Sequence, residues 1–211
     1  MAAKQFIVDD FKKNVANGNI DLVNDTIKAA LCEEFSPSYS AWASETSYSE
    51  GDIVVPSSRN GHRYRAKNGG DSNTDEPSWP TSAEGTVDDN DITWEEYGGE
   101  HADNEFWDDV SGNEVSDGDG YSAGGESLGS KAVEKDSDDP MATQWDAGDV
   151  TWSGLTKTMR TAWLYVDGDT AGDNDYLISY ILLDDTPDDV SVSGVDFTLQ
   201  WDSDGIVEYG R

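Results

Sequence analysis

Few side chains in this chain have the chemistry of a catalyst, and none has the spacing of a catalytic motif. Only two histidines, His62 and His101, are present to titrate near neutral pH. The sequence has no Gly-x-Ser-x-Gly element, no phosphate-binding loop and no dinucleotide fingerprint. Carboxylates are so abundant that no pair stands out as a general acid and base. We therefore expect a protein that is not an enzyme.

One group of carboxylates begins like a calcium-binding loop. Ala171 and Ile178, however, stand at the fifth and twelfth positions, where an EF-hand needs oxygen ligands. The favoured interpretation is a solvated hairpin tip, with no cofactor, and an irregular structural cation site is the weaker alternative. That alternative would use the aspartates of this stretch: Asp167, Asp169, Asp173 and Asp175.

Basic side chains are scarce, and several of them gather in one short stretch beside His62. The chain has 45 Asp and Glu against 13 Lys and Arg, which gives a formal net charge of -32. A local gap in an acidic surface indicates contact with a partner, so we expect the basic cluster to be a contact surface. The cluster consists of Arg59, Arg63, Arg65 and Lys67.

The charge itself predicts the environment of the protein. A compact domain with this much like charge repels itself in dilute buffer, whereas molar salt shortens the Debye length to roughly 3 Å. Eight Trp, nine Tyr and five Phe are spread along the chain, unlike the composition of a disordered acidic tail. We expect a folded protein adapted to high salt, the alternative being an ordinary protein with an extreme surface. Nucleic acid and anionic membranes are excluded as partners.

Cysteine content and hydropathy set further limits. The single cysteine, Cys32, rules out an intrachain disulfide and a cysteine-based zinc site, and we expect it to be a buried structural thiol. The first residues are too polar for a signal peptide, and no apolar stretch reaches the roughly 18 residues of a membrane span. We therefore expect the protein to act without membrane insertion.

The elements that must position these residues are mainly strands. Ile7, Phe11 and Val15 recur at a spacing of four, and Asn17-Gly18 follows, which predicts one N-terminal helix. The most apolar segments, Trp163–Val166 and Leu177–Leu182, are expected at the centre of a sheet. The other expected strands are short and bounded by turn residues: 26–32, 52–55, 62–66, 91–97, 129–134, 143–145, 150–152, 159–166, 176–183, 195–201 and 206–209.

Turn signals every 8 to 12 residues favour an antiparallel β-sandwich of jelly-roll or immunoglobulin-like type. The composition changes over residues 39–100, which are rich in Ser, Trp, Pro and Glu. We expect residues 1–38 and 101–211 to form a discontinuous β-sandwich domain, with 39–100 as a small inserted β module, since exposed loops tolerate insertions.

The inserted stretch carries an ordered set of motifs: Ala41-Trp42, Gly51-Asp52-Ile53-Val54, Gly61-His62-Arg63-Tyr64, Glu76-Pro77-Ser78-Trp79 and Ile92-Thr93-Trp94. This order resembles the small chitin-binding-type carbohydrate-binding module, over about 55 residues, although Lys67-Asn68-Gly69 stands where that family usually has a Trp. The resemblance implies that Trp42, Tyr64 and Trp79 stack on sugar rings. The alternative for each is core packing.

The flanking segments also resemble a known group. Phe11–Leu22, Asp25–Leu31, Trp107–Ser116, Gly120–Gly125, Asp149–Ser153 and Phe197–Asp202 resemble a family of tailed-virus virion proteins. The family has no defined activity, so the resemblance implies a virion component only. In other members a short loop replaces the counterpart of 39–100, as an insertion would require.

Together, these features predict a viral structural protein of a halophilic tailed archaeal virus. We expect a homo-oligomeric capsid decoration or turret subunit, located on the virion and bound to neighbouring virion proteins. Its inserted module would make weak multivalent contacts with host surface glycans during host attachment. The alternatives are a tail tube, baseplate or fibre component, and a free carbohydrate-binding lectin.

Overall fold

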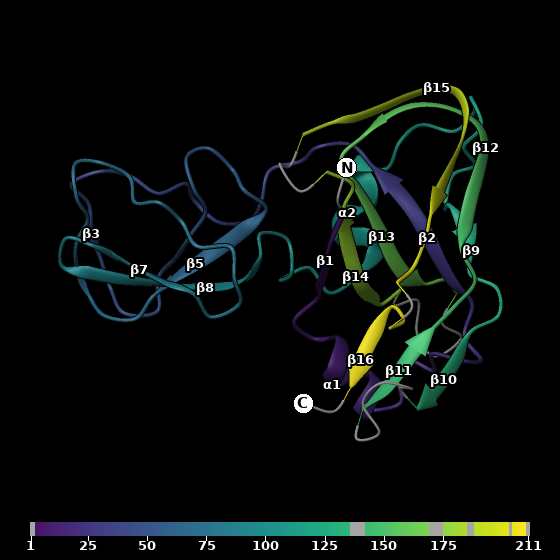
Figure 1. The fold of residues 1–211 in the computed structure, drawn as a ribbon, viewed down its shortest axis with the longest axis horizontal. Coiled ribbons are helices and arrows are strands. Elements are labelled where there is room, and N and C mark those ends of the chain that lie inside the picture. The colour runs from purple at the N-terminus through teal and green to yellow at the C-terminus, as the bar shows by residue number, and fades with distance from the viewer. Residues whose placement is uncertain (1–2, 136–141, 169–174, 185–187, 203, 210–211) are drawn as a thin grey trace.

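The computed structural model describes residues 3–135, 142–168, 175–184, 188–202 and 204–209. The described chain is mainly β, and all strand pairs within its sheets are antiparallel, which confirms the predicted class. Figure 1 shows the strands in two lobes, a smaller one that contains β3 to β8 and a larger one that contains the remaining strands.

A five-stranded sheet forms the centre of the larger lobe. Its strand order is β1 (Lys4–Ile7), β14 (Leu177–Leu182), β13 (Thr161–Val166), β2 (Ile27–Cys32) and β9 (Glu126–Ser127). Every residue of β13 and β14 is buried, as the continuous apolar runs of these segments predict for central strands. Cys32 is buried at the end of β2, and burial raises the pKa of its thiol.

Two smaller sheets complete the larger lobe. A long ribbon pairs β12 (Val150–Met159) with β15 (Val190–Leu199), and a three-stranded sheet has the order β10 (Ala132–Lys135), β11 (Thr143–Asp146), β16 (Val207–Tyr209). The ribbon lies over the central sheet, with β12 in contact with β2 and β9 (Figure 1). Trp152 and Leu155 of β12 are buried in the main core, whereas Val195 of β15 is exposed.

The smaller lobe has its own core. A four-stranded sheet has the order β4 (Ile53–Val54), β5 (His62–Ala66), β8 (Ile92–Gly99), β7 (Thr86–Asp89), and β3 (Ser47–Tyr48) pairs with β6 (Gly70–Asp71). Its buried apolar residues form a cluster separate from the core of the larger lobe: Trp42, Val54, Tyr64, Ala66, Ile92 and Trp94.

Helices are short. The N-terminal helix α1 covers Phe11–Ala16 and ends at Asn17, followed by Gly18 at a φ of 74°. Ile7, which the sequence pattern placed on this helix, instead lies in β1, paired with Ser179 of β14. A second helix, α2 (Trp107–Val110), and a 3-10 turn, η1 (Ser111–Asn113), were not predicted. Trp107 on α2 stacks on Tyr165 of β13 with ring centroids 4.5 Å apart.

Gly125 packs closely against the backbone of β2 at the edge of the central sheet. Gly125 precedes β9 at a φ of 70°, and a Cβ there would overlap the carbonyl oxygen of Ala29. We expect Gly125→Ala to lower the free energy of unfolding by about 2–4 kcal/mol, because it adds backbone strain and a steric clash. Denaturant titration in molar salt measures this loss. Gly112→Ala, at a site with no neighbouring atom within 4 Å, is the matched control, and equal losses in the two variants would contradict the explanation.

Candidate functional site

The aromatic side chains proposed for sugar stacking form the core of the smaller lobe. Tyr64 is completely buried, and its hydroxyl donates to the Pro80 carbonyl at 2.8 Å. Trp42 is 8 % exposed, and its indole N–H donates to the buried Asp89 carboxylate, which also accepts from Trp94. Satisfied polar groups and burial place Trp42 and Tyr64 in packing roles, so their rings are not available for a sugar in this structure.

Trp79 is the third proposed stacking residue, and it lies at the edge of the same cluster. Its ring packs on Tyr64, with centroids 4.3 Å apart, and its N–H donates to Glu76 at 2.9 Å. The side chain is only partly buried, so it keeps some ring surface in solvent. Of the three proposed residues, Trp79 alone retains the exposure that ring stacking needs.

Arg63 of the basic cluster is buried where the two lobes meet. Arg63 is 1 % exposed, and both oxygens of Asp9 in the larger lobe accept from its Nη2, at 2.8 and 2.7 Å. The same guanidinium donates to the Tyr97 carbonyl and to the Tyr39 hydroxyl. Arg63 therefore joins the two lobes in this structure.

Arg59 makes a second connection between the lobes. Its guanidinium donates to both oxygens of the buried Glu100, at 2.5 and 3.0 Å, and to Glu34 of the larger lobe at 3.0 Å. The Phe35 carbonyl accepts from it as well. Bidentate pairing of a guanidinium with a carboxylate gives both strength and a fixed orientation. Arg59 is thus a structural residue of the junction.

The remaining two members of the cluster lie on the surface. Arg65 and Lys67 both pair with Glu95, at 2.9 and 2.8 Å, and are 39 % and 47 % exposed in their side chains. Together they hold the pKa of the Glu95 carboxyl below its usual range. The local excess of positive charge seen in the sequence is therefore largely matched by acidic partners from β8 and from the larger lobe.

A histidine bridge lies at the same junction. Lys4 Nζ lies 2.5 Å from His62 Nε2, and His62 Nδ1 lies 2.8 Å from Glu96 Oε1. Because an ammonium only donates, Nε2 accepts and the ring proton sits on Nδ1, which donates to Glu96. Burial first, and the Lys4 charge in addition, lower the pKa of His62 against the opposing effect of Glu96. The junction thus holds a neutral imidazole.

The aspartates proposed for a cation are only partly placed. Asp167 pairs with Lys28 at 2.8 Å, and Asp175 accepts from the Gly168 backbone N–H at 3.0 Å. Asp169 and Asp173 lie outside the described residues. Within the described ranges, no group of three or more His, Cys, Asp or Glu side chains is arranged to hold a metal ion.

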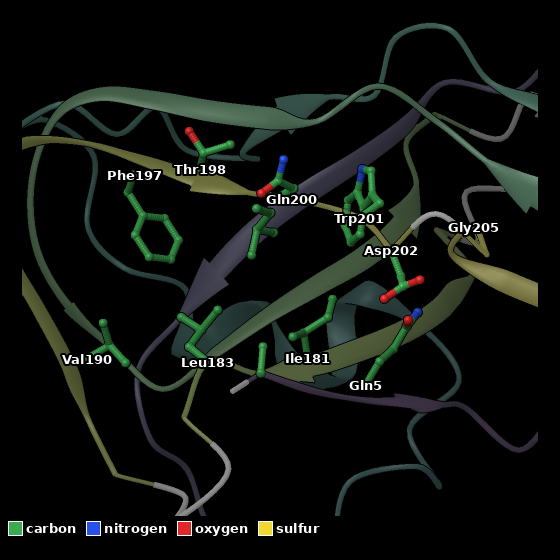
Figure 2. Close-up of a pocket in the computed structure, with 12 residues that line it drawn as sticks. Gln5, Ile181, Leu183, Val190, Phe197, Thr198, Gln200, Trp201, Asp202 and Gly205 are labelled. Carbon is green, nitrogen blue, oxygen red and sulfur yellow. The ribbon is translucent and has the colours of Figure 1, made fainter. Parts of the chain in front are cut away.

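A cleft lies in the larger lobe, away from the residues that the motifs singled out. It has a volume of about 730 Å³ and opens between β1 and β14 on one side and the end of β15 on the other. Ile181, Leu183, Val190 and Leu199 form its apolar floor and are all below a tenth exposed. Figure 2 shows the Phe197 ring pointing from β15 into the hollow, toward Val190 and Leu183.

Polar side chains line one end of this cleft. Gln5 and Asp202 point toward one another across it (Figure 2), and Gln200 and Trp201 lie on the segment that follows β15. The Trp201 indole N–H donates to the Gly148 carbonyl at 3.1 Å, and the Gln5 amide donates to Ser179 Oγ at 2.8 Å. These bonds fix the orientation of both side chains before any ligand arrives.

No residue spacing in the sequence points to this cleft, because its walls come from opposite ends of the chain. Only Phe197 and Trp201 were visible as an aromatic pair near the C-terminus, and a strand with alternating residues explains that pattern equally well.

Comparisons with protein-family models, with curated proteins and with solved structures found no match to this chain. No helix in the described ranges is both long and apolar enough to cross a membrane.

Removal of Arg63 tests the junction. We expect Arg63→Met to lower the free energy of unfolding by about 2–3 kcal/mol, less than for a stranded buried charge because Asp9 is half exposed. Lys67→Met, which removes an exposed pair, is the control and should change it by no more than about 1 kcal/mol. Denaturant titration followed by Trp fluorescence in molar salt measures both. Equal stability of Arg63→Met and the native chain would contradict this role.

His101 predicts a dependence of stability on pH. Burial, then the Arg59 charge, lower the pKa of His101 to about 3. The unfolded chain binds a proton near pH 6.5 and the folded chain does not, so stability is complete above that pH and falls as the pH decreases toward 3, at about 1.4 kcal/mol per pH unit. We expect His101→Gln to flatten the loss measured between about pH 6 and pH 5. If the free energy of unfolding of His101→Gln falls with pH as steeply as that of the native chain, His101 does not cause the loss.

Proposed function

We propose that this chain is a structural protein on the surface of a tailed virus that infects a halophilic archaeon, as a capsid decoration or turret subunit without enzymatic activity. The observation that carries the proposal is the charge of -32 on a chain with two well-packed cores. Such a chain is suited to molar salt, where its self-repulsion is screened. The resemblance of the flanking segments to virion proteins points to a particle rather than to an enzyme.

The junction supports a display role. Arg59 and Arg63 fasten the smaller lobe to the larger one through charge-assisted hydrogen bonds to Glu34 and Asp9. We infer that residues 39–100 are an inserted module held in a fixed direction by a β-sandwich domain, which comprises 1–38 and 101–211. A fixed module on many identical subunits would allow weak contacts with host glycans to add up.

A tail tube, baseplate or fibre component is the second candidate, since the same virion resemblance fits it. A free lectin is the third, and the partly exposed Trp79 favours it over a purely structural role. The three candidates differ in where the chain is found and in how many copies are present.

Purified particles test the proposal directly. We expect the chain in virions of its halophilic host at a copy number that matches the capsid lattice, located on the head by cryo-electron microscopy of particles with a tagged copy. A position on the tail would favour the second candidate. Absence of the chain from purified particles would exclude both virion roles.

A further inference from the structure

The cleft of the larger lobe has the size and shape of a small-molecule site. Its volume of about 730 Å³ falls within the roughly 300–1,000 Å³ typical of ligand pockets. It exists because the β12–β15 ribbon covers the β2 and β9 side of the central sheet. Ile181 and Leu183, at the β14 side, form the floor of the uncovered part.

The lining combines two kinds of chemistry in one place. Phe197 and Trp201 offer partly buried aromatic surface over an apolar floor. Gln5, Gln200 and Asp202 offer amide donors, amide acceptors and a carboxylate that accepts several hydrogen bonds. A ligand that satisfies both must have an apolar face and a rim of hydroxyl groups. A pyranose ring has this character, because its C–H face packs on aromatic rings while its hydroxyls donate and accept.

The charge of the lining limits which saccharides the cleft can bind. None of the described lining residues is basic, and Asp202 adds to the strongly negative field of the whole chain. Sulfated, phosphorylated or uronic acid sugars would meet repulsion with no cation to pair with. In molar salt, long-range attraction is screened, so recognition depends on ring packing and short hydrogen bonds. Both conditions favour an uncharged saccharide.

The lining is also held in place. Trp201 is fixed by its indole bond to Gly148 and by its backbone N–H, which donates to Asp149 at 3.2 Å. The Asp202 carboxylate accepts from the Asp204 backbone N–H at 3.1 Å, which sets the turn that presents it. Preformed geometry of this kind reduces the entropic cost of ligand binding.

From these observations we propose that the cleft between β1, β14 and β15 binds a neutral saccharide, with Phe197 as the ring platform and Gln5, Gln200 and Asp202 as hydroxyl partners. The larger lobe would then carry a glycan site of its own, separate from the weak contacts proposed for residues 39–100. The proposal rests on the proposed function only for the biological source of the glycan, because binding by the purified chain does not require a particle.

Binding of the full chain to a panel of neutral oligosaccharides and their sulfated counterparts, in molar salt, tests the proposal. We expect saturable changes in Trp fluorescence and in NMR amide shifts around β15 with at least one neutral sugar and none of the sulfated ones. Phe197→Leu, which keeps apolar volume and removes the ring, should weaken binding at least tenfold, and Gln200→Ala a few fold. Trp79→Leu, the matched change in the smaller lobe, should leave affinity unchanged.

Three results would overturn the saccharide proposal. Binding that Trp79→Leu abolishes and Phe197→Leu leaves intact would overturn the proposal in favour of the smaller lobe. No binding to any neutral sugar, or a preference for the sulfated ones, would also overturn it. Amide spectra of each variant in the free state show that it is folded. Virion location is measured separately, so failure here and failure of the particle assay are distinguishable.

Discussion

The buried guanidinium of Arg63 fixes the relation between the two lobes of this molecule. It lies on β5 of the smaller lobe and reaches Asp9, which precedes α1 in the larger lobe. The Arg63 guanidinium is 1 % exposed, and a buried charge is stable only when its N–H donors are paired. Here those donors bond to the Asp9 carboxylate, the Tyr97 carbonyl and the Tyr39 hydroxyl. Asp9 is half exposed and keeps contact with water, which lowers the desolvation cost of the pair.

Basic side chains are scarce in this chain, and two of them lie at the junction. A chain with 13 basic and 45 acidic residues has few positive charges available for pairing, yet Arg59 and Arg63 both lie at the junction, with side chains 20 % and 1 % exposed. Exposed pairs lose most of their strength in molar salt, whereas buried ones are screened much less. Placement of basic residues between the lobes therefore stabilises the junction under the conditions in which an acidic surface is advantageous.

Local sequence patterns predicted the strands better than the contacts between distant segments. The segment 62–66 and the burial of Leu177–Leu182 follow from alternation and apolar runs, which depend on neighbours in the chain. Ile7 fits a helical spacing with Phe11 equally well, and only the free edge of β14 decides that it belongs to a strand. The pairing of Arg63 with Asp9 has no local signature, so the sequence alone predicts a contact surface for the basic cluster.

The cleft also depends on segments that are far apart in the chain. The ribbon of β12 and β15 supplies two strands against a central sheet of five, and residues of β1, β14 and β15 line the cleft. A chain under selection for packing alone would fill that space with large apolar side chains from β15. Instead, the segment after β15 places Gln200 and Asp202 beside Phe197 and Trp201. Polar groups next to aromatic rings in an open cleft stabilise the fold less than apolar residues would, so their presence there favours recognition of a ligand over packing.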